Sequence, residues 1–329
     1  MGTRMLVPFC LLITVLLITG SVEAQQPKKV PRIGWLTGGS FSATADRVEA
    51  FRQGLRELGY VEGKNIVIEW RGADGNRDRQ RALAGELVRL KVDVIVTAGA
   101  GGTRAAKEAT ATIPVVMAQD DDPVGTGHVA SLARPGGNIT GLASLSPELS
   151  GKRLELLKEI VPKLSRVAVF ATSASTDYTQ TLKEIELAAG AFGVKLQHLD
   201  ILGPKDIETA FRAAGMERAD AGLMQVSGPV LNIYRKQLID LAIKSRLPVI
   251  YNLRSHAEAG GLMSYGIHLP DLDRRAATYV DKILKGAKPA DLPIEQPIKF
   301  EFIINLKAAK QIGLTIPPKV LAQADRVIK

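Results

Sequence analysis

The chain of 329 residues carries 43 basic and 34 acidic side chains, giving a formal net charge of +9 at pH 7. The basic residues lie among acidic ones, as in Lys152–Lys163, instead of clustering with aromatic residues. We therefore expect a solvated basic surface and no nucleic-acid binding, with docking on an acidic partner as the alternative. Cys10 is the only cysteine and precedes the expected mature chain, which excludes disulfides, thiolate catalysis and cysteine-ligated zinc there.

The N-terminal segment has the pattern of a cleaved export signal. Arg4 supplies a positive start, Leu6–Ile18 form a short apolar core, and residues 22–24 form a small-residue cleavage pattern. Cys10 lacks the small residues that precede a lipid-anchored cysteine. We therefore expect cleavage near Ala24 and an exported protein without a lipid anchor. No later stretch approaches the roughly 20 apolar residues of a membrane helix, so we expect the exported protein to be soluble.

In the first half of the mature chain, short β-branched runs alternate with helical patterns. This alternation is typical of βαβ units and a parallel sheet. After the first strand, apolar residues recur at helical spacing and predict one buried helix face: Val48, Phe51, Leu55 and Leu58. The predicted strands are 30–36, 65–70, 92–98 and 113–118.

A second α/β series follows the proline- and glycine-rich segment Arg134–Gly141. Its internal pattern echoes the first series, since residues 96–120 and 226–254 both contain a strand end, a glycine turn, an amphipathic helix and an apolar strand. The sequence therefore predicts two similar lobes, although this pattern is common in α/β folds. The predicted strands are 166–171, 194–201, 222–226 and 248–251.

Candidate ligand residues of the first lobe lie in loops that follow predicted strands. In open parallel sheets, ligands bind at the carboxyl ends of strands, where helix N-termini present free N–H groups. The loop 98–104 is rich in glycine and could hold a carboxylate, with a tight turn as the alternative. Arg104 stands where a dinucleotide fingerprint needs its third glycine. The candidates are Gly39, Ser40, Gly99, Ala100, Gly101, Gly102 and Thr103.

The loops of the second lobe offer hydroxyl groups and tyrosines. Such side chains suit the orientation of a small polar or amphipathic ligand. A plain surface role is the alternative for each of them. The candidates are Ser173, Tyr178, Ser227, Tyr251 and Tyr265.

Three consecutive aspartates follow the strand 113–118. Asp122 precedes Pro123, a pattern that predicts a helix N-cap. Asp121 is expected to be solvated. Asp120 is expected to face a cleft, where it would accept hydrogen bonds from a ligand amine or hydroxyl, with a helix or loop cap as the alternative.

The sequence predicts neither a metal site nor a cofactor nor a catalytic set. Gly-x-Ser-x-Gly is absent, and no two histidines have the spacing of metal ligands. An exported hydrolase or sugar-processing enzyme is the rival hypothesis, and it would need a carboxylate pair such as Asp120 with Glu258 or Asp177. The four histidines are His128, His198, His256 and His268.

Several long segments together resemble one family. Asp122–Gly141 carries an Asp-Pro-Val-Gly…Leu-Ala-Arg-Pro-Gly-Gly-Asn-x-Thr-Gly pattern, which is similar to the hallmark of ABC transporter substrate-binding proteins of the tryptophan/tyrosine-type uptake group. The resemblance extends over almost the whole mature chain. Its other segments are Phe51–Arg71, Leu87–Gly99, Ala257–Gly266 and Ala290–Pro318.

The resemblance implies a type I periplasmic-binding-protein fold. In such a fold, two Rossmann-like lobes with parallel sheets are joined by a multi-strand hinge and close around a small ligand, here an amino acid or related carboxylate. It also implies a free periplasmic monomer that delivers its ligand to an ABC permease in the inner membrane. A ligand-sensing domain for a membrane kinase is the alternative. We expect an N-terminal lobe of residues 25–143 plus 267–293 and a C-terminal lobe of 144–266 plus 294–329, after a signal peptide of residues 1–24.

Overall fold

The computed structural model describes residues 29–41, 44–144, 149–174, 178–225 and 229–329, of which Pro31–Lys329 belong to one compact unit. The expected signal peptide lies outside the described residues. No helix in the described ranges is long and apolar enough to cross a membrane.

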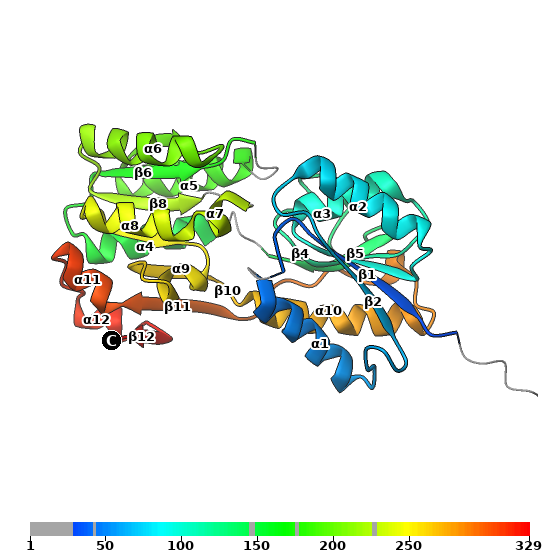
Figure 1. Cartoon of the computed structure of the whole chain (residues 1–329). Coiled ribbons are helices and arrows are strands. Elements are labelled where there is room, and N and C mark those ends of the chain that lie inside the picture. The colour runs from blue at the N-terminus through cyan, green and yellow to red at the C-terminus, as the bar shows by residue number, and fades with distance from the viewer. Residues whose placement is uncertain (1–28, 42–43, 145–148, 175–177, 226–228) are drawn as a thin grey trace, which may run out of the picture. The chain divides into compact units, whose positions relative to one another are not determined.

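The N-terminal lobe is built on a parallel sheet of five strands in the order β2-β1-β3-β4-β5 (Figure 1). Helices cover both faces of this sheet, so its strands are buried apolar runs. The strands are β1 (Arg32–Thr37), β2 (Val67–Gly72), β3 (Val94–Ala98), β4 (Val115–Asp120) and β5 (Ile139–Ala143). The helices are α1 (Ala45–Glu57), α2 (Arg77–Arg89), α3 (Ala100–Ala109) and α10 (Leu269–Leu284).

Helix α1 packs with α10 on one face of this sheet. Val48, Phe51 and Leu55 are buried, as the helical spacing predicts. Leu58 is exposed, because α1 ends at Glu57 and the helical face stops there. Gly54 lets the two helices approach closely, since a Cβ at this position would collide with the carbonyl oxygen of a residue in α10.

The C-terminal lobe contains a sheet of seven strands in the order β12-β11-β10-β9-β8-β6-β7. This sheet is mixed, not purely parallel, because β11 runs antiparallel to β10. The strands are β6 (Arg166–Ala171), β7 (Lys195–Asp200), β8 (Ala221–Gln225), β9 (Val249–Tyr251), β10 (Met263–Ile267), β11 (Phe300–Asn305) and β12 (Arg326–Ile328). The helices are α4 (Leu149–Ile160), α5 (Tyr178–Phe192), α6 (Pro204–Met216), α7 (Pro229–Ile233), α8 (Arg235–Lys244), α9 (Arg254–Glu258), α11 (Leu306–Ile312) and α12 (Pro318–Leu321).

The chain passes between the two sheets after β5, after β10 and before β11. The last of these segments follows a short 3₁₀ helix (Pro289–Asp291) and runs beside β5, where Thr140 Oγ1 donates to Leu292 O at 2.7 Å and Ala143 N donates to Glu295 O at 2.9 Å. The segment therefore runs along the edge of the N-terminal sheet until it leaves for β11. Its arrival from that side explains why β11 enters the second sheet antiparallel to β10.

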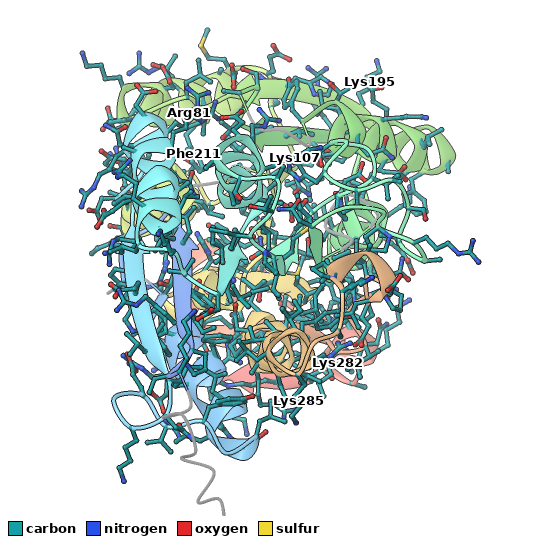
Figure 2. All side chains as sticks on the ribbon, turned by 90° about the vertical axis from the view of Figure 1, so that its right-hand side faces the viewer. Arg81, Lys107, Lys195, Phe211, Lys282 and Lys285 are labelled. Atoms are coloured by element: carbon teal, nitrogen blue, oxygen red, sulfur yellow. The ribbon has the colours of Figure 1, made fainter. Side chains whose placement is uncertain are left out.

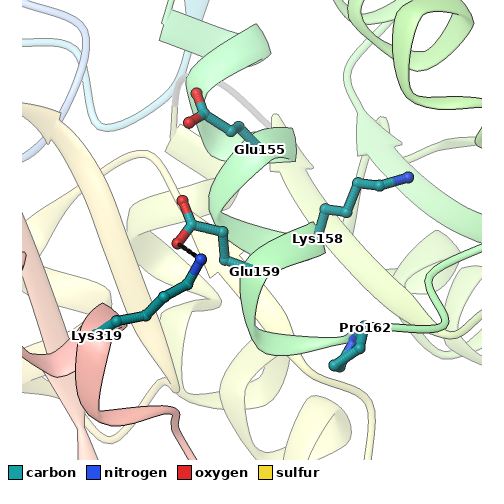
Figure 3. A pocket seen from close by; sticks show the side chains of 5 residues that line it. All are labelled: Glu155, Lys158, Glu159, Pro162 and Lys319. Atoms are coloured by element: carbon teal, nitrogen blue, oxygen red, sulfur yellow. Dashed lines mark ion pairs between the residues drawn. The ribbon is translucent and has the colours of Figure 1, made fainter.

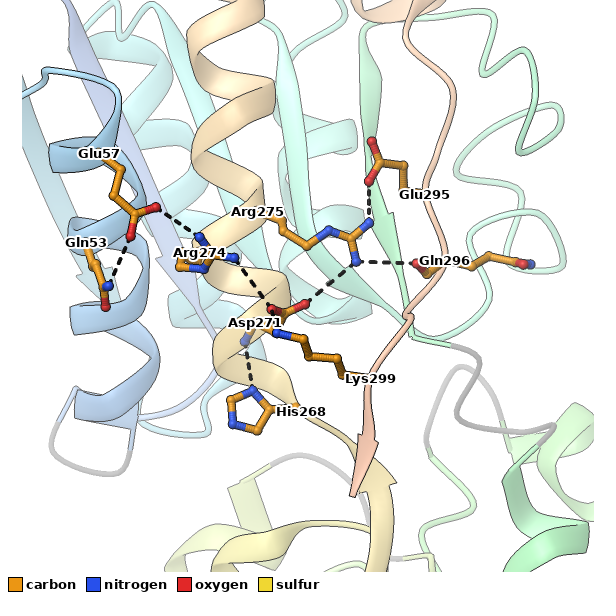
Figure 4. Close-up of polar contacts among 9 residues, drawn as sticks. All are labelled: Gln53, Glu57, His268, Asp271, Arg274, Arg275, Glu295, Gln296 and Lys299. Atoms are coloured by element: carbon orange, nitrogen blue, oxygen red, sulfur yellow. Dashed lines mark hydrogen bonds and ion pairs between the residues drawn. The ribbon is translucent and has the colours of Figure 1, made fainter. Parts of the chain in front are cut away.

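Polar contacts hold the start of α10 to this returning segment (Figure 4). His268 caps the helix, since its Nδ1 accepts from Asp271 N at 3.2 Å. Asp271 is buried and its Oδ1 accepts from Lys299 Nζ at 3.1 Å, while Arg275 donates to the Glu295 carboxylate. These contacts fix the second and third crossings against the same helix.

Basic side chains are distributed over several elements of both lobes (Figure 2). Lys107 belongs to α3, Lys195 to β7 and Lys282 to α10, and Lys285 caps the C-terminus of that helix. These lysines therefore come from both lobes and do not cluster on one element.

Candidate functional site

The first turn of α3 contains the glycine-rich loop that is expected to hold an anion. Gly99 has φ 104°, a conformation that favours glycine, and its N–H donates to Gln119 O at 3.1 Å. Gly102 N and Thr103 N both donate to Gly99 O. Within the described ranges, the N–H groups of Ala100 and Gly101 are the only ones in this turn without an acceptor. These two N–H groups are therefore the donors available to an anion.

The other candidate residues of these loops have internal roles. The Thr103 hydroxyl is buried and lies 3.0 Å from Thr97 Oγ1. Gly39 N donates to Thr37 Oγ1 at 3.3 Å, and Ser40 O accepts from Thr44 Oγ1 at 3.1 Å. These bonds engage polar groups of Gly39 and Ser40 with neighbouring residues of the same loop.

Asp120 ends β4 and its side chain is fully buried. Its Oδ2 lies 3.0 Å from Nδ1 of the buried His128, and that nitrogen also lies 3.1 Å from Thr126 Oγ1. Its Oδ1 has no hydrogen-bond partner in the part of the chain that the structure describes. Asp120 therefore presents one paired oxygen and one oxygen that is still able to accept a bond.

The two neighbouring aspartates differ from expectation. Asp121, expected to be solvated, is half-buried and its Oδ1 accepts from Ser144 Oγ at 2.6 Å. Asp122 caps a turn, since its Oδ1 accepts from Gly125 N at 2.8 Å, but no helix follows at Pro123. Two closely spaced glycines disfavour a helix there, and Gly127 adopts φ 70°.

The second-lobe candidates lie in several different environments. Ser173 uses both its N–H and its hydroxyl to donate to Asp200, at 2.8 and 2.6 Å. Tyr178 begins α5 and is partly buried against the core of the C-terminal lobe, and Tyr265 stacks on Phe300 with ring centroids 6.4 Å apart. Ser227 lies outside the described residues.

Tyr251 is a core residue of the C-terminal lobe. It is 0% exposed and stacks on His256, with ring centroids 5.0 Å apart. Burial raises the pKa of its hydroxyl and lowers the pKa of His256 to about 3, so both rings are neutral near pH 7. No ligand contact of Tyr251 follows from this geometry.

Arg153 is a buried cation at the strand ends of the C-terminal lobe. It is 1% exposed, and burial lowers its pKa to about 10. Its Nε donates to Tyr265 O at 2.8 Å, and Nη1 lies 3.5 Å from Gln225 Oε1. The mixed-charge stretch around Arg153 indicated a solvated helix face, so the sequence carried no signal for this burial.

Glu258, one carboxylate of the enzyme hypothesis, is engaged in two ion pairs. Glu258 pairs with Arg254 at 3.0 Å and with Arg326 at 2.7 Å, while Asp177 lies outside the described residues. Among the residues that are described, no group of three histidine, cysteine or acidic side chains has the geometry of a metal site.

One surface hollow in the described part of the chain lies away from these candidate residues (Figure 3). It has a volume of about 460 Å³ and lies between α4 and α12. Glu159 and Lys319 form an ion pair across it at 3.4 Å. Its lining is charged and lacks aromatic side chains: Glu155, Lys158, Glu159, Pro162 and Lys319.

Two α/β lobes joined by three crossings are the architecture of the class of two-lobed solute-binding proteins. Within that class, residues 40–328 match the family described as ABC transporter substrate binding protein, and the chain belongs to this family. Members of this family bind substrates for transport and are not enzymes.

Three relatives show how far the similarity extends. The "Tyrosine-binding protein" of Clostridioides difficile strain R20291 is 25% identical over 268 residues, which are 81% of this chain and 76% of the relative. A conserved domain protein of Vibrio cholerae has 29% identity and a TM-score of 0.85, covering 91% of this chain and 100% of that one. An ABC domain from Streptococcus pneumoniae in complex with L-Trp has 26% identity and a TM-score of 0.84, covering 91% and 99%.

Proposed function

We propose that this protein is the solute receptor of an ABC importer and binds an amino acid or a related carboxylate. The observation that carries the proposal is the family match together with two relatives, one named for tyrosine and one bound to L-Trp. The receptor delivers its ligand to a permease in the inner membrane. It works as a monomer in the periplasm, after removal of a signal peptide near Ala24.

The ligand lies in a cleft formed by the strand-end loops of two lobes, residues 25–143 plus 267–293 and residues 144–266 plus 294–329. Its carboxylate is received by the N–H groups of Ala100 and Gly101, which have no acceptor in the described structure. Its ammonium group is received by Asp120, whose Oδ1 has a lone pair available.

The remaining contacts come from loops that begin at neighbouring strand ends. In the first lobe, Gly39, Ser40, Gly99, Gly102 and Thr103 shape the site, chiefly through their backbone. In the second lobe, the backbone oxygen of Tyr265 accepts from the buried Arg153, and Tyr265 is the aromatic candidate. Ser173, Tyr178 and Ser227 are the further candidates of this lobe. These assignments give the C-terminal lobe a covering role and the N-terminal lobe the two charged contacts.

Calorimetry with the full set of proteinogenic amino acids, and with a set of sugars of similar size, tests the proposal. We expect saturable binding of at least one amino acid at micromolar concentration and a matching rise in melting temperature, because a ligand that binds only the folded state stabilises it. Binding of a sugar and of no amino acid would overturn the assignment of ligand class.

A further inference from the structure

Gln80 is a buried amide of the N-terminal lobe that joins two of the candidate loops. It lies on α2 and is 7% exposed. With its amide oxygen facing the nearest N–H groups, Oε1 accepts from Gly38 N at 3.1 Å and from Gly102 N at 3.2 Å. Gly38 follows β1 and Gly102 belongs to the first turn of α3, so a single oxygen connects loops from two different strands.

Three glycines of these loops pack directly against the Gln80 amide. A Cβ at Gly38 would lie 3.3 Å from the nearest amide atom, one at Gly101 would lie 3.2 Å away, and one at Gly102 would lie 3.4 Å away. These separations are shorter than nearly all Cβ contacts in proteins. A methyl group at any of the three positions would push the amide away from the two N–H groups, so the glycines have a packing function as well as backbone freedom.

The contact with Gly102 also orients the rest of the first turn. Gly102 N shares its hydrogen between Gln80 and Gly99 O, which lies 2.9 Å away. The two N–H groups that have no acceptor belong to the two residues immediately before Gly102. Fixing Gly102 from the side therefore fixes the direction in which those donors point.

We propose that Gln80 is a positioning residue of the ligand site, which holds the loop after β1 and the first turn of α3 in the arrangement that receives the ligand's anionic group. This inference rests on the proposed function, since it assumes that an anionic group binds at that turn. Gln80 itself does not touch the ligand. It acts by preorganisation, because donors that are already ordered lose less entropy when the ligand binds.

Two substitutions of similar size separate hydrogen bonding from packing. Gln80→Met keeps the volume but removes the acceptor, and we expect it to weaken amino-acid binding about tenfold, which corresponds to the loss of about 1.4 kcal/mol. Gln80→Glu keeps an oxygen that both N–H groups can use. Because its carboxylate also repels the ligand's anionic group, we expect Gln80→Glu to keep amide exchange at Gly38 and Gly102 slow without restoring ligand affinity. Such a rescue of the exchange is not expected if the side chain only fills space.

Gln197→Met is the matched control. Gln197 is 8% exposed, lies on β7 of the other lobe, and donates from Nε2 to Ala213 O at 3.1 Å. The substitution makes the same chemical change at the same degree of burial. We expect a lower melting temperature but unchanged ligand affinity.

Hydrogen exchange of the backbone amides gives a second readout that needs no ligand. In Gln80→Met, the amides of Gly38 and Gly102 should exchange faster, while Gln197→Met should leave both unchanged. Equal affinity of wild type and Gln80→Met would overturn the positioning role. If the wild type binds no amino acid, the proposed function fails, and unchanged exchange at Gly38 and Gly102 would then independently overturn the proposal for Gln80.

Discussion

Asp120 Oδ2 and His128 Nδ1 lie 3.0 Å apart, and both side chains are buried in the N-terminal lobe. A carboxylate oxygen can only accept, so Nδ1 carries the proton of this bond. The pair joins the end of β4 to the turn-rich segment that follows it. One of the three consecutive aspartates is therefore bound by a histidine eight residues further along the chain.

His128→Ala should destabilise the protein by about 1–3 kcal/mol, because it leaves a buried carboxylate without its partner. Urea unfolding measures this change. His198→Ala is the control, since His198 is exposed and its nearest acidic atom, Glu186 Oε1, lies 3.9 Å away. Equal unfolding midpoints of the two variants would contradict the structural role of the Asp120–His128 pair.

Asp120→Asn should weaken binding of a zwitterionic amino acid at least about tenfold, if Oδ1 receives the ligand ammonium. The amide keeps an acceptor but loses the negative charge. Calorimetry at constant pH measures the affinity. Asp122→Asn is a suitable control, because Asp122 only caps the adjacent turn, and equal affinity losses in both variants would refute a specific role for Asp120.

Arg47→Met should cost about 3–5 kcal/mol of folding free energy, because it leaves the buried Asp273 carboxylate uncompensated. Arg47 Nε and Nη2 donate to the two oxygens of Asp273 at 2.7 and 2.9 Å, and the Asp273 side chain is 0% exposed. The double variant Arg47→Met/Asp273→Leu should recover much of the loss. Chemical denaturation of all four species gives the coupling energy.

The exposed ion pair Arg56–Glu49 is the control for this double-mutant cycle of Arg47 and Asp273. Its atoms approach to 2.6 Å, but the two side chains are 49% and 59% exposed. Its coupling should lie at about 0–1 kcal/mol, because solvent screens it. A coupling for Arg47–Asp273 as small as that of the exposed pair would contradict the expected importance of burial.

His256 should make stability depend on pH below neutrality. Burial lowers its pKa from 6.5 to about 3, so between these values the unfolded state binds a proton that the folded state does not bind. The contribution of His256 to the free energy of unfolding is therefore fully present above pH 6.5 and is lost as the pH falls toward 3. His256→Gln should make the melting temperature depend less on pH between these two values. An unchanged slope would contradict the lowered pKa of His256.

Gly99→Ala should destabilise the protein by about 1–2 kcal/mol, because φ 104° is unfavourable for any residue with a Cβ. Gly190→Ala is the control. It lies inside α5, has no positive φ, and nothing lies within 4 Å of the position of its Cβ. That variant should be stabilised by about 0.5–1 kcal/mol, since alanine favours helix.

Much of the fold follows from local pattern. Strand–helix alternation predicts both α/β lobes, and the spacing of Val48, Phe51 and Leu55 predicts the buried face of α1. The mixed character of the second sheet does not follow from it. The direction of β11 depends on where the preceding segment leaves β5, which is a long-range property that strand periodicity does not encode.

Sequence by itself determined the family, the order of elements and the loops at the strand ends, because these depend on hydrophobic period, turn residues and long matching segments. Only the tertiary structure decided which polar groups inside those loops are already engaged. Arg153 is buried and Tyr251 belongs to the core, while Gln80 binds two loops at once. These outcomes depend on which strands become neighbours in the sheet, and residues far apart in sequence meet only when the sheet has formed.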